Sequence, residues 1–181
     1  MVIMILGDPY SFSIILDVVD NWNSKDAYSF YNGILVFCID GKFFPRKLVN
    51  ATLGSEVPNL VRQLSQIPIN ERLFDMKKEE AFSAMYRIIH PEDIDNDNDY
   101  SYDMTPYCFG DISCLVFAVS NGEQVRVLAS SLKYKPEEGI HEINNIEIAE
   151  AYISVGDMAE IVSGLNMQLS QQILLNEKYK N

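Results

Sequence analysis

Apolar residues in the first fifty positions form short runs that turn residues separate. The runs at 3–6 and 12–19 are rich in Ile, Leu and Val and are broken at Asp8-Pro9, which predicts two strands. A third apolar run at 34–39 leads into Asp40-Gly41 and then into further aromatic residues. Because Asp-Gly tolerates the positive φ angles of a tight turn, this stretch predicts a β-hairpin.

Two helices are predicted in the next forty residues. The first begins at Ser55, has Pro58 in its first turn and is stopped by Pro68. The second covers 74–89, where large apolar side chains recur at helical spacing until Pro91.

The C-terminal half returns to strands. A continuous apolar run at 112–119 and an alternating, half-buried pattern at 124–130 are joined by Asn121-Gly122, a second hairpin turn. Residues 143–155 predict one more strand. An apolar stripe then predicts a final helix that starts at Ser154 or Asp157 and runs to about residue 175.

This order of elements predicts an α+β fold, with an antiparallel sheet built from hairpins and about three helices. No repeat and no Gly/Ser-rich or Pro-rich linker divides the 181 residues, so we expect 1–181 to form a single domain. Hydrophobic residues make up 48% of the chain, which excludes a disordered protein. A chain of this length buries about 70% of its surface and needs no disulfide or metal to stabilise a core.

The cysteines and the N-terminus indicate a cytoplasmic location. Three cysteines are an odd number without a regular spacing, which fits a reducing compartment. The apolar N-terminal stretch reaches Gly7 after six residues and is too short for a signal peptide. No apolar run approaches the ~20 residues that span a bilayer, so we expect no membrane association.

Two segments carry the excess of negative charge. The chain has 26 acids and 14 bases, a net charge of -12. Residues 91–103 contain six acids and residues 137–160 contain seven, and neither segment contains Lys or Arg. The two segments therefore total -13 and the remainder of the chain is +1. Phosphate contacts would work against this charge, so we expect no direct binding of nucleic acid and favour a basic protein partner.

An acidic loop at 91–107 is the first candidate for that partner, because tyrosines interleave with its acids and interfaces favour tyrosine. Glu147 and Glu150 are second candidates, although their opposite parity would not place both on one face of a regular strand. A merely solvated loop remains the alternative interpretation. The candidate partner-binding residues are Asp93, Asp95, Asp97, Asp99, Tyr100, Tyr102, Asp103, Glu147 and Glu150.

Catalytic and metal-binding patterns are weak. Residues 93–99 begin like a calcium loop, but Asn98 stands where such a loop needs Gly, and Met104 stands where it needs a bidentate Glu. Phosphate-binding, dinucleotide-binding and nucleophile-elbow motifs are absent from the sequence, and Cys114 lies within an apolar strand. We therefore expect no catalytic residues, no cofactor and no metal site, and a protein that is not an enzyme.

A string of residues in the N-terminal third carries a family resemblance. It comprises Gly7-Asp8-Pro9-Tyr10, Phe12, Trp22, Asn32-Gly33, Asp40-Gly41-Lys42, Pro45 and Ala51-Thr52-Leu53. This string resembles the immunity proteins of polymorphic toxin and contact-dependent growth inhibition systems, and is most similar to the immunity protein 42 family. The resemblance covers about the first 55 residues and brings no catalytic motif.

The resemblance implies a small cytoplasmic protein that binds the C-terminal toxin domain of an exported effector and blocks its active site or its access to substrate. A nuclease toxin, which is basic because it holds phosphates, would suit the acidic segments. Two other hypotheses remain open at this stage. One is an acidic adaptor for a basic host protein, and the other is a hydrolase or metal-dependent enzyme that uses the carboxylates at 93–103.

Overall fold

The N-terminal aliphatic runs build an antiparallel sheet, called the first sheet here. The computed structural model describes residues 3–23, 31–91, 97–110, 112–135, 137, 140–143 and 146–179. The first sheet has the strand order β1-β2-β3-β4, and β5 also pairs with β3. Its strands are β1 Met4–Gly7, β2 Phe12–Val18, β3 Asn32–Ile39, β4 Lys42–Phe44 and β5 Ala51–Thr52. The hairpin predicted at Asp40-Gly41 is confirmed, and both turn residues have positive φ.

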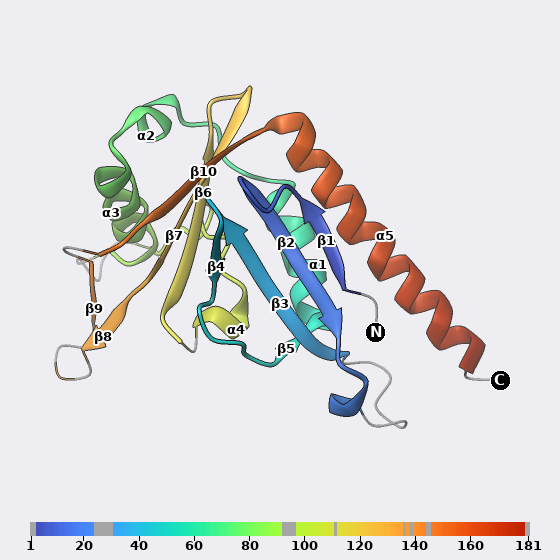
Figure 1. Ribbon diagram of the computed structural model, residues 1–181. Helices are drawn as coiled ribbons and strands as arrows, with labels where there is room; N and C mark the ends of the chain where they lie inside the picture. The colour runs from blue at the N-terminus through green and yellow to red at the C-terminus, as the bar shows by residue number, and fades with distance from the viewer. Residues whose placement is uncertain are drawn as a thin grey trace.

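A second antiparallel sheet has the order β10-β7-β6, and it lies beside the first sheet, to its left in Figure 1. These strands are β6 Cys114–Ser120, β7 Gln124–Ser131 and β10 Ala149–Ser154. The predicted turn at Asn121-Gly122 joins β6 to β7. Two further strands, β8 Lys133–Lys135 and β9 Ile140–Glu142, form a separate two-stranded ribbon.

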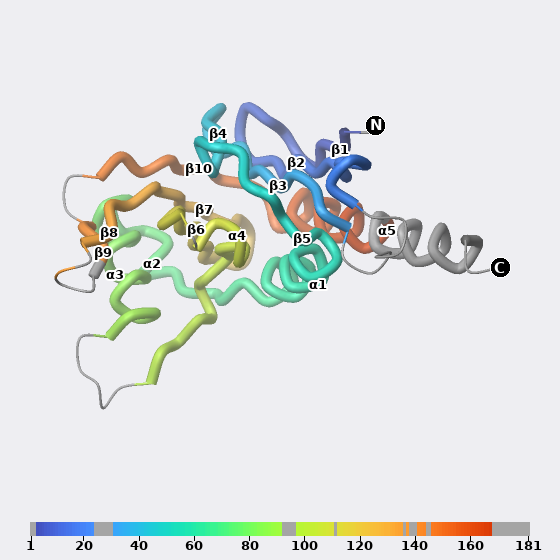
Figure 2. Tube along the Cα trace, turned by 90° about the horizontal axis from the view of Figure 1, so that it is seen from below, coloured from blue at the N-terminus to red at the C-terminus, as the bar shows by residue number. Residues whose placement is uncertain are grey.

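The helices lie on both sides of the second sheet. Figure 2 shows α1 and α5 next to each other beneath the first sheet, and α2 and α3 on the far side of the second sheet. Antiparallel sheets with helices confirm the predicted α+β class. The helices are α1 Leu53–Leu64, α2 Glu71–Asp75, α3 Lys78–Ile89, α4 Tyr107–Gly110 and α5 Val155–Tyr179, with a 3-10 turn at Asp20–Trp22.

Two hydrophobic cores share the second sheet. The first core lies between the first sheet, α1, α5 and one face of the second sheet, and includes Ile14, Phe37 and Val127. The second core lies between the opposite face and the helices α2 and α3, where the rings of Phe82 and Phe117 are 4.8 Å apart. Burial of both faces makes this sheet the centre of the molecule.

The half-buried pattern predicted for residues 124–130 is wrong, because β7 is buried from Val125 to Ser130. Its odd-numbered residues face the first core, as predicted. Its even-numbered residues face the second core, although two of them, Arg126 and Ser130, are polar. The alternation in the sequence suggested that these polar residues face solvent. In the structure, Arg126 binds carbonyl groups at the end of α2, and the Ser130 hydroxyl donates to the carbonyl oxygen of Glu147 at 2.9 Å.

The helix predicted at 74–89 is interrupted. Helix α2 ends at Asp75, Met76 is extended, and α3 begins at Lys78. The break leaves three carbonyl groups at the end of α2 for another donor, and the guanidinium of Arg126 binds all of them. A side chain fifty residues away therefore ends this helix.

The strand predicted at 143–155 is also shorter than expected. Only Ala149–Ser154 belongs to it, while residues 146–148 lie outside any strand. The buried residues of β10 are Ala149, Ala151 and Ile153, which face the first core. Glu150 and Tyr152 lie on the other face, towards α2, so Glu150 does not point into open solvent.

A close approach of backbone and helix at Gly7 gives a test of this packing. Gly7 has φ +94°, and a Cβ there would overlap the Phe12 carbonyl oxygen and come within 2.9 Å of Ile161 Cδ1. Gly122 has φ +96° with no atom within 4 Å of a Cβ, so it is a matched control. Both Ala variants incur backbone strain of order 1–3 kcal/mol. The free energy of unfolding measured in urea should fall about 1–3 kcal/mol further for Gly7→Ala than for Gly122→Ala, because the added methyl group overpacks the site at Gly7. Equal losses for the two variants would contradict the packing of α5 against the β1–β2 turn.

Candidate functional site

The described part of the predicted acidic loop, residues 97–107, is anchored at both ends. The side-chain amide of Asn98 donates to the carbonyl oxygen of Ile89, 2.6 Å away at the end of α3. At the other end, the buried carboxylate of Glu56 on α1 accepts the backbone N–H groups of Tyr107 and Cys108, at 3.0 and 2.9 Å. These N–H groups belong to the first turn of α4 and have no acceptor within the helix, so a carboxylate is a favourable partner for them. The loop is therefore held between α3 and α1.

The outward-facing part of this loop contains three of the candidate residues. Asp97, Asp99 and Tyr100 are exposed. Asp99 accepts the backbone N–H of Ser101 at 2.9 Å, and neither aspartate forms an ion pair with another residue that the structure describes. Asp93 and Asp95 lie outside the described residues.

Tyr102 and Asp103, by contrast, turn towards the protein. Tyr102 is buried, and its hydroxyl accepts a hydrogen bond of 3.0 Å from the Asn70 side chain. Asp103 is partly buried beside β6 and accepts the backbone N–H of Thr105 at 2.9 Å. Burial raises the pKa of the Asp103 carboxyl, and the hydrogen bonds from Thr105 oppose this shift. These two residues support the loop from beneath.

Glu147 lies on the surface between two cations. Lys42 Nζ is 3.0 Å from its Oε1, and Arg46 Nη2 is 2.5 Å from its Oε2. The hydrogen bond from Arg46, followed by that from Lys42, lowers the pKa of the Glu147 carboxyl. This acid of the second segment is paired within the chain, and it ties the segment before β10 to β4.

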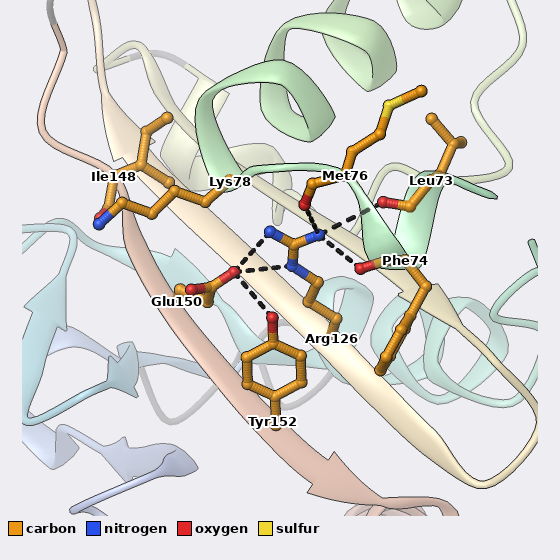
Figure 3. Close-up of polar contacts among 8 residues, drawn as sticks. All are labelled: Leu73, Phe74, Met76, Lys78, Arg126, Ile148, Glu150 and Tyr152. Atoms are coloured by element: carbon orange, nitrogen blue, oxygen red, sulfur yellow. Dashed lines mark hydrogen bonds and ion pairs between the residues drawn. The ribbon is translucent and has the colours of Figure 1, made fainter. Parts of the chain in front are cut away.

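Glu150 forms the most buried ion pair of the described residues (Figure 3). Its Oε1 lies 2.7 Å from Arg126 Nε and 2.6 Å from Arg126 Nη2, and it also accepts a hydrogen bond of 3.2 Å from the Tyr152 hydroxyl. Only 2% of the Arg126 side chain is exposed. The pair is diagonal across the β7–β10 ladder, because Arg126 lies opposite Tyr152 and Glu150 lies two residues earlier on β10.

The remaining donors of Arg126 bind the backbone at the end of α2. Nη1 donates to the carbonyl oxygens of Phe74 at 2.6 Å, Met76 at 2.7 Å and Leu73 at 3.3 Å. A planar guanidinium can satisfy several acceptors at once, which a Lys could not do in this geometry. This role of Arg126 was missed in the sequence, where a single Arg in an alternating strand looks like an ordinary solvent-facing residue.

Two other sequence candidates concern metal binding and a cysteine nucleophile. In the part of the chain that the structure describes, no group of three or more His, Cys, Asp or Glu side chains could hold a metal ion. Cys114 is buried in the first core, as expected, and burial raises the pKa of its thiol to about 12. None of the described helices is both long enough and apolar enough to cross a membrane.

Comparison with known proteins places the chain in a family. The family model of immunity protein 42 matches residues 4–168, far beyond the N-terminal string that suggested the resemblance. The chain therefore belongs to the immunity protein 42 family. Its fold is similar to that in the crystal structure of CdiI from Burkholderia dolosa AUO158, with a TM-score of 0.73 and 22% sequence identity over 91% of this chain and 99% of that one. No curated protein matches the chain.

The Arg126–Glu150 pair yields a stability prediction. Arg126→Met leaves the Glu150 carboxylate without its cation and three carbonyl groups without their Arg126 donor. The free energy of unfolding measured in urea should therefore fall by about 3–5 kcal/mol. Glu147→Gln removes an exposed surface acid and should leave the urea midpoint almost unchanged, because exposed ion pairs contribute little. Similar midpoints for the two variants would contradict the assignment of Arg126 as the link between α2 and the second sheet.

Proposed function

We propose that this chain is the immunity protein of a contact-dependent growth inhibition system, and that it binds and neutralises the C-terminal toxin domain of its cognate effector without catalysis. The observation that carries this proposal is the family match over residues 4–168. The likeness of fold to CdiI, a contact-dependent growth inhibition immunity protein, supports the choice of system. The encounter would take place in the cytoplasm.

The toxin in this proposal is a basic domain, such as a nuclease, and it meets the exposed carboxylates of the acidic loop. Asp97 and Asp99 supply negative charge that no described cation neutralises, and Tyr100 supplies contact area. We include Asp93 and Asp95 from the sequence. Anchoring at Asn98 and at Glu56 supports this role, because a preorganised loop loses less entropy on binding.

The other predicted contact residues take different positions in the proposal. Tyr102 and Asp103 hold the loop in shape from beneath. Glu147 and Glu150 can reach a toxin only by giving up Lys42, Arg46 or Arg126. An interface of the usual size covers about 800 Å² on each partner, so the loop would be one part of a larger contact.

Co-expression with the toxin domain encoded immediately upstream tests the function. We expect cells to survive and the two proteins to elute together from a sizing column. If the toxin domain still kills the cells while both proteins are soluble and form no complex, the proposal is wrong.

Charge removal tests the role of the loop. Asp97→Asn/Asp99→Asn should slow association with the toxin domain by about tenfold at low salt, because complementary charge speeds encounter. The control, Glu79→Gln/Glu80→Gln, removes the same charge from the exposed start of α3. Equal association rates for the two double variants would remove the loop from the interface.

A further inference from the structure

A groove separates the turn after β1 from the start of α5. Its volume is about 570 Å³, within the ~300–1,000 Å³ typical of ligand pockets. Its lining includes buried apolar side chains from three elements, namely Phe12 of β2, Ile153 of β10 and Ile161 of α5. Ile5 of β1 also lines it and has 52% of its surface exposed. In Figure 1, the β1–β2 turn and the first turn of α5 lie at the same end of the molecule.

The polar lining of this groove is acidic. Asp8, Asp157 and Glu160 line it, whereas its described lining residues include no Lys, Arg or His. Asp157 accepts a hydrogen bond of 2.6 Å from Ser154 Oγ and so belongs to the cap of α5. The N-terminus of α5 contributes roughly half a positive charge, which three carboxylates outweigh. None of these three acids has an ion pair within the described part of the chain.

An apolar lining beneath unpaired carboxylates fits one kind of side chain best. Lys and Arg have an alkyl stem that packs on apolar surface and a charged head that stays at the polar rim. A neutral apolar ligand would leave the carboxylates uncompensated, and an acidic ligand would be repelled. We propose that the groove receives a Lys- or Arg-bearing segment of the cognate toxin domain. This inference rests on the proposed function and assigns it a second contact surface.

The groove is separate from the acidic loop. The loop runs beside β6, where Asp103 forms a bridge with Phe117, whereas the groove lies at β10. These strands are the two opposite edges of the second sheet. Figure 2 likewise places α3, from which the loop departs, far from the start of α5. Substitutions in the groove and in the acidic loop therefore test separate contributions to toxin binding.

Two variants separate the electrostatic and apolar contributions of the groove. Asp8→Asn/Glu160→Gln keeps the hydrogen bond that Asp8 Oδ1 accepts from the Tyr10 amide, and it leaves the Asp157 cap intact. It should raise the Kd for the toxin domain about tenfold at low salt and reduce the salt dependence of binding. Ile5→Ser should raise the Kd to a similar extent with the salt dependence unchanged. Glu79→Gln/Glu80→Gln is the control and should stay within about twofold of the wild type.

The binding measurements test the groove separately from the proposed function. If the wild type binds and both groove variants match the control, the groove is not a docking surface, while the proposed function stands. If Asp8→Asn/Glu160→Gln weakens binding and the control does not, the inference holds. If the wild type does not bind the toxin domain encoded upstream, both the proposed function and the docking role of the groove are wrong. Unchanged urea midpoints of the variants show that any loss arises in the complex rather than in folding.

Discussion

The buried guanidinium of Arg126 is the constraint on which the arrangement of layers depends. It binds Glu150 on the neighbouring strand and three carbonyl groups at the end of α2, so it joins the second sheet to the helices that cover it. A charge with 2% exposure is tolerable only when its donors are satisfied. The same contacts lie at the break between α2, which ends at Asp75, and α3, which begins at Lys78.

The structure divides the acids of the chain by what they bind. Glu56 satisfies the first amides of α4, Glu147 pairs with two surface cations, and Glu150 pairs with Arg126. Glu56 and Glu150 maintain the fold, whereas the Glu147 pairs lie on the surface and only neutralise its charge. Asp97 and Asp99 on one side, and Asp8 and Glu160 on the other, have no ion pair among the described residues. A net charge of -12 therefore overstates what a partner meets. Among the acids without an internal cation, we assign those of the acidic loop and of the groove to the toxin.

Local rules predicted most of the strands and two of the turns. Asp40-Gly41 and Asn121-Gly122 specify hairpins because their own backbone preferences decide the turn. The break between α2 and α3 could not be predicted, because its cause is a side chain on a distant strand. The pairing of Glu147 with Lys42 joins residues 105 positions apart and likewise leaves no local signal. Charge segregation in the sequence locates the acidic segments, but only packing shows which of their described carboxylates are paired within the chain.

The most direct test of this division is hydrogen exchange of the chain with and without the toxin domain encoded upstream. The account predicts slower exchange on binding at residues 97–101 and around the groove, in the β1–β2 turn and the first turns of α5. It predicts little change in the ribbon of β8 and β9 and at the start of α3. Protection confined to that ribbon and to α3, with the acidic loop and the groove unchanged, would contradict the claim that the carboxylates of the acidic loop and of the groove meet the toxin.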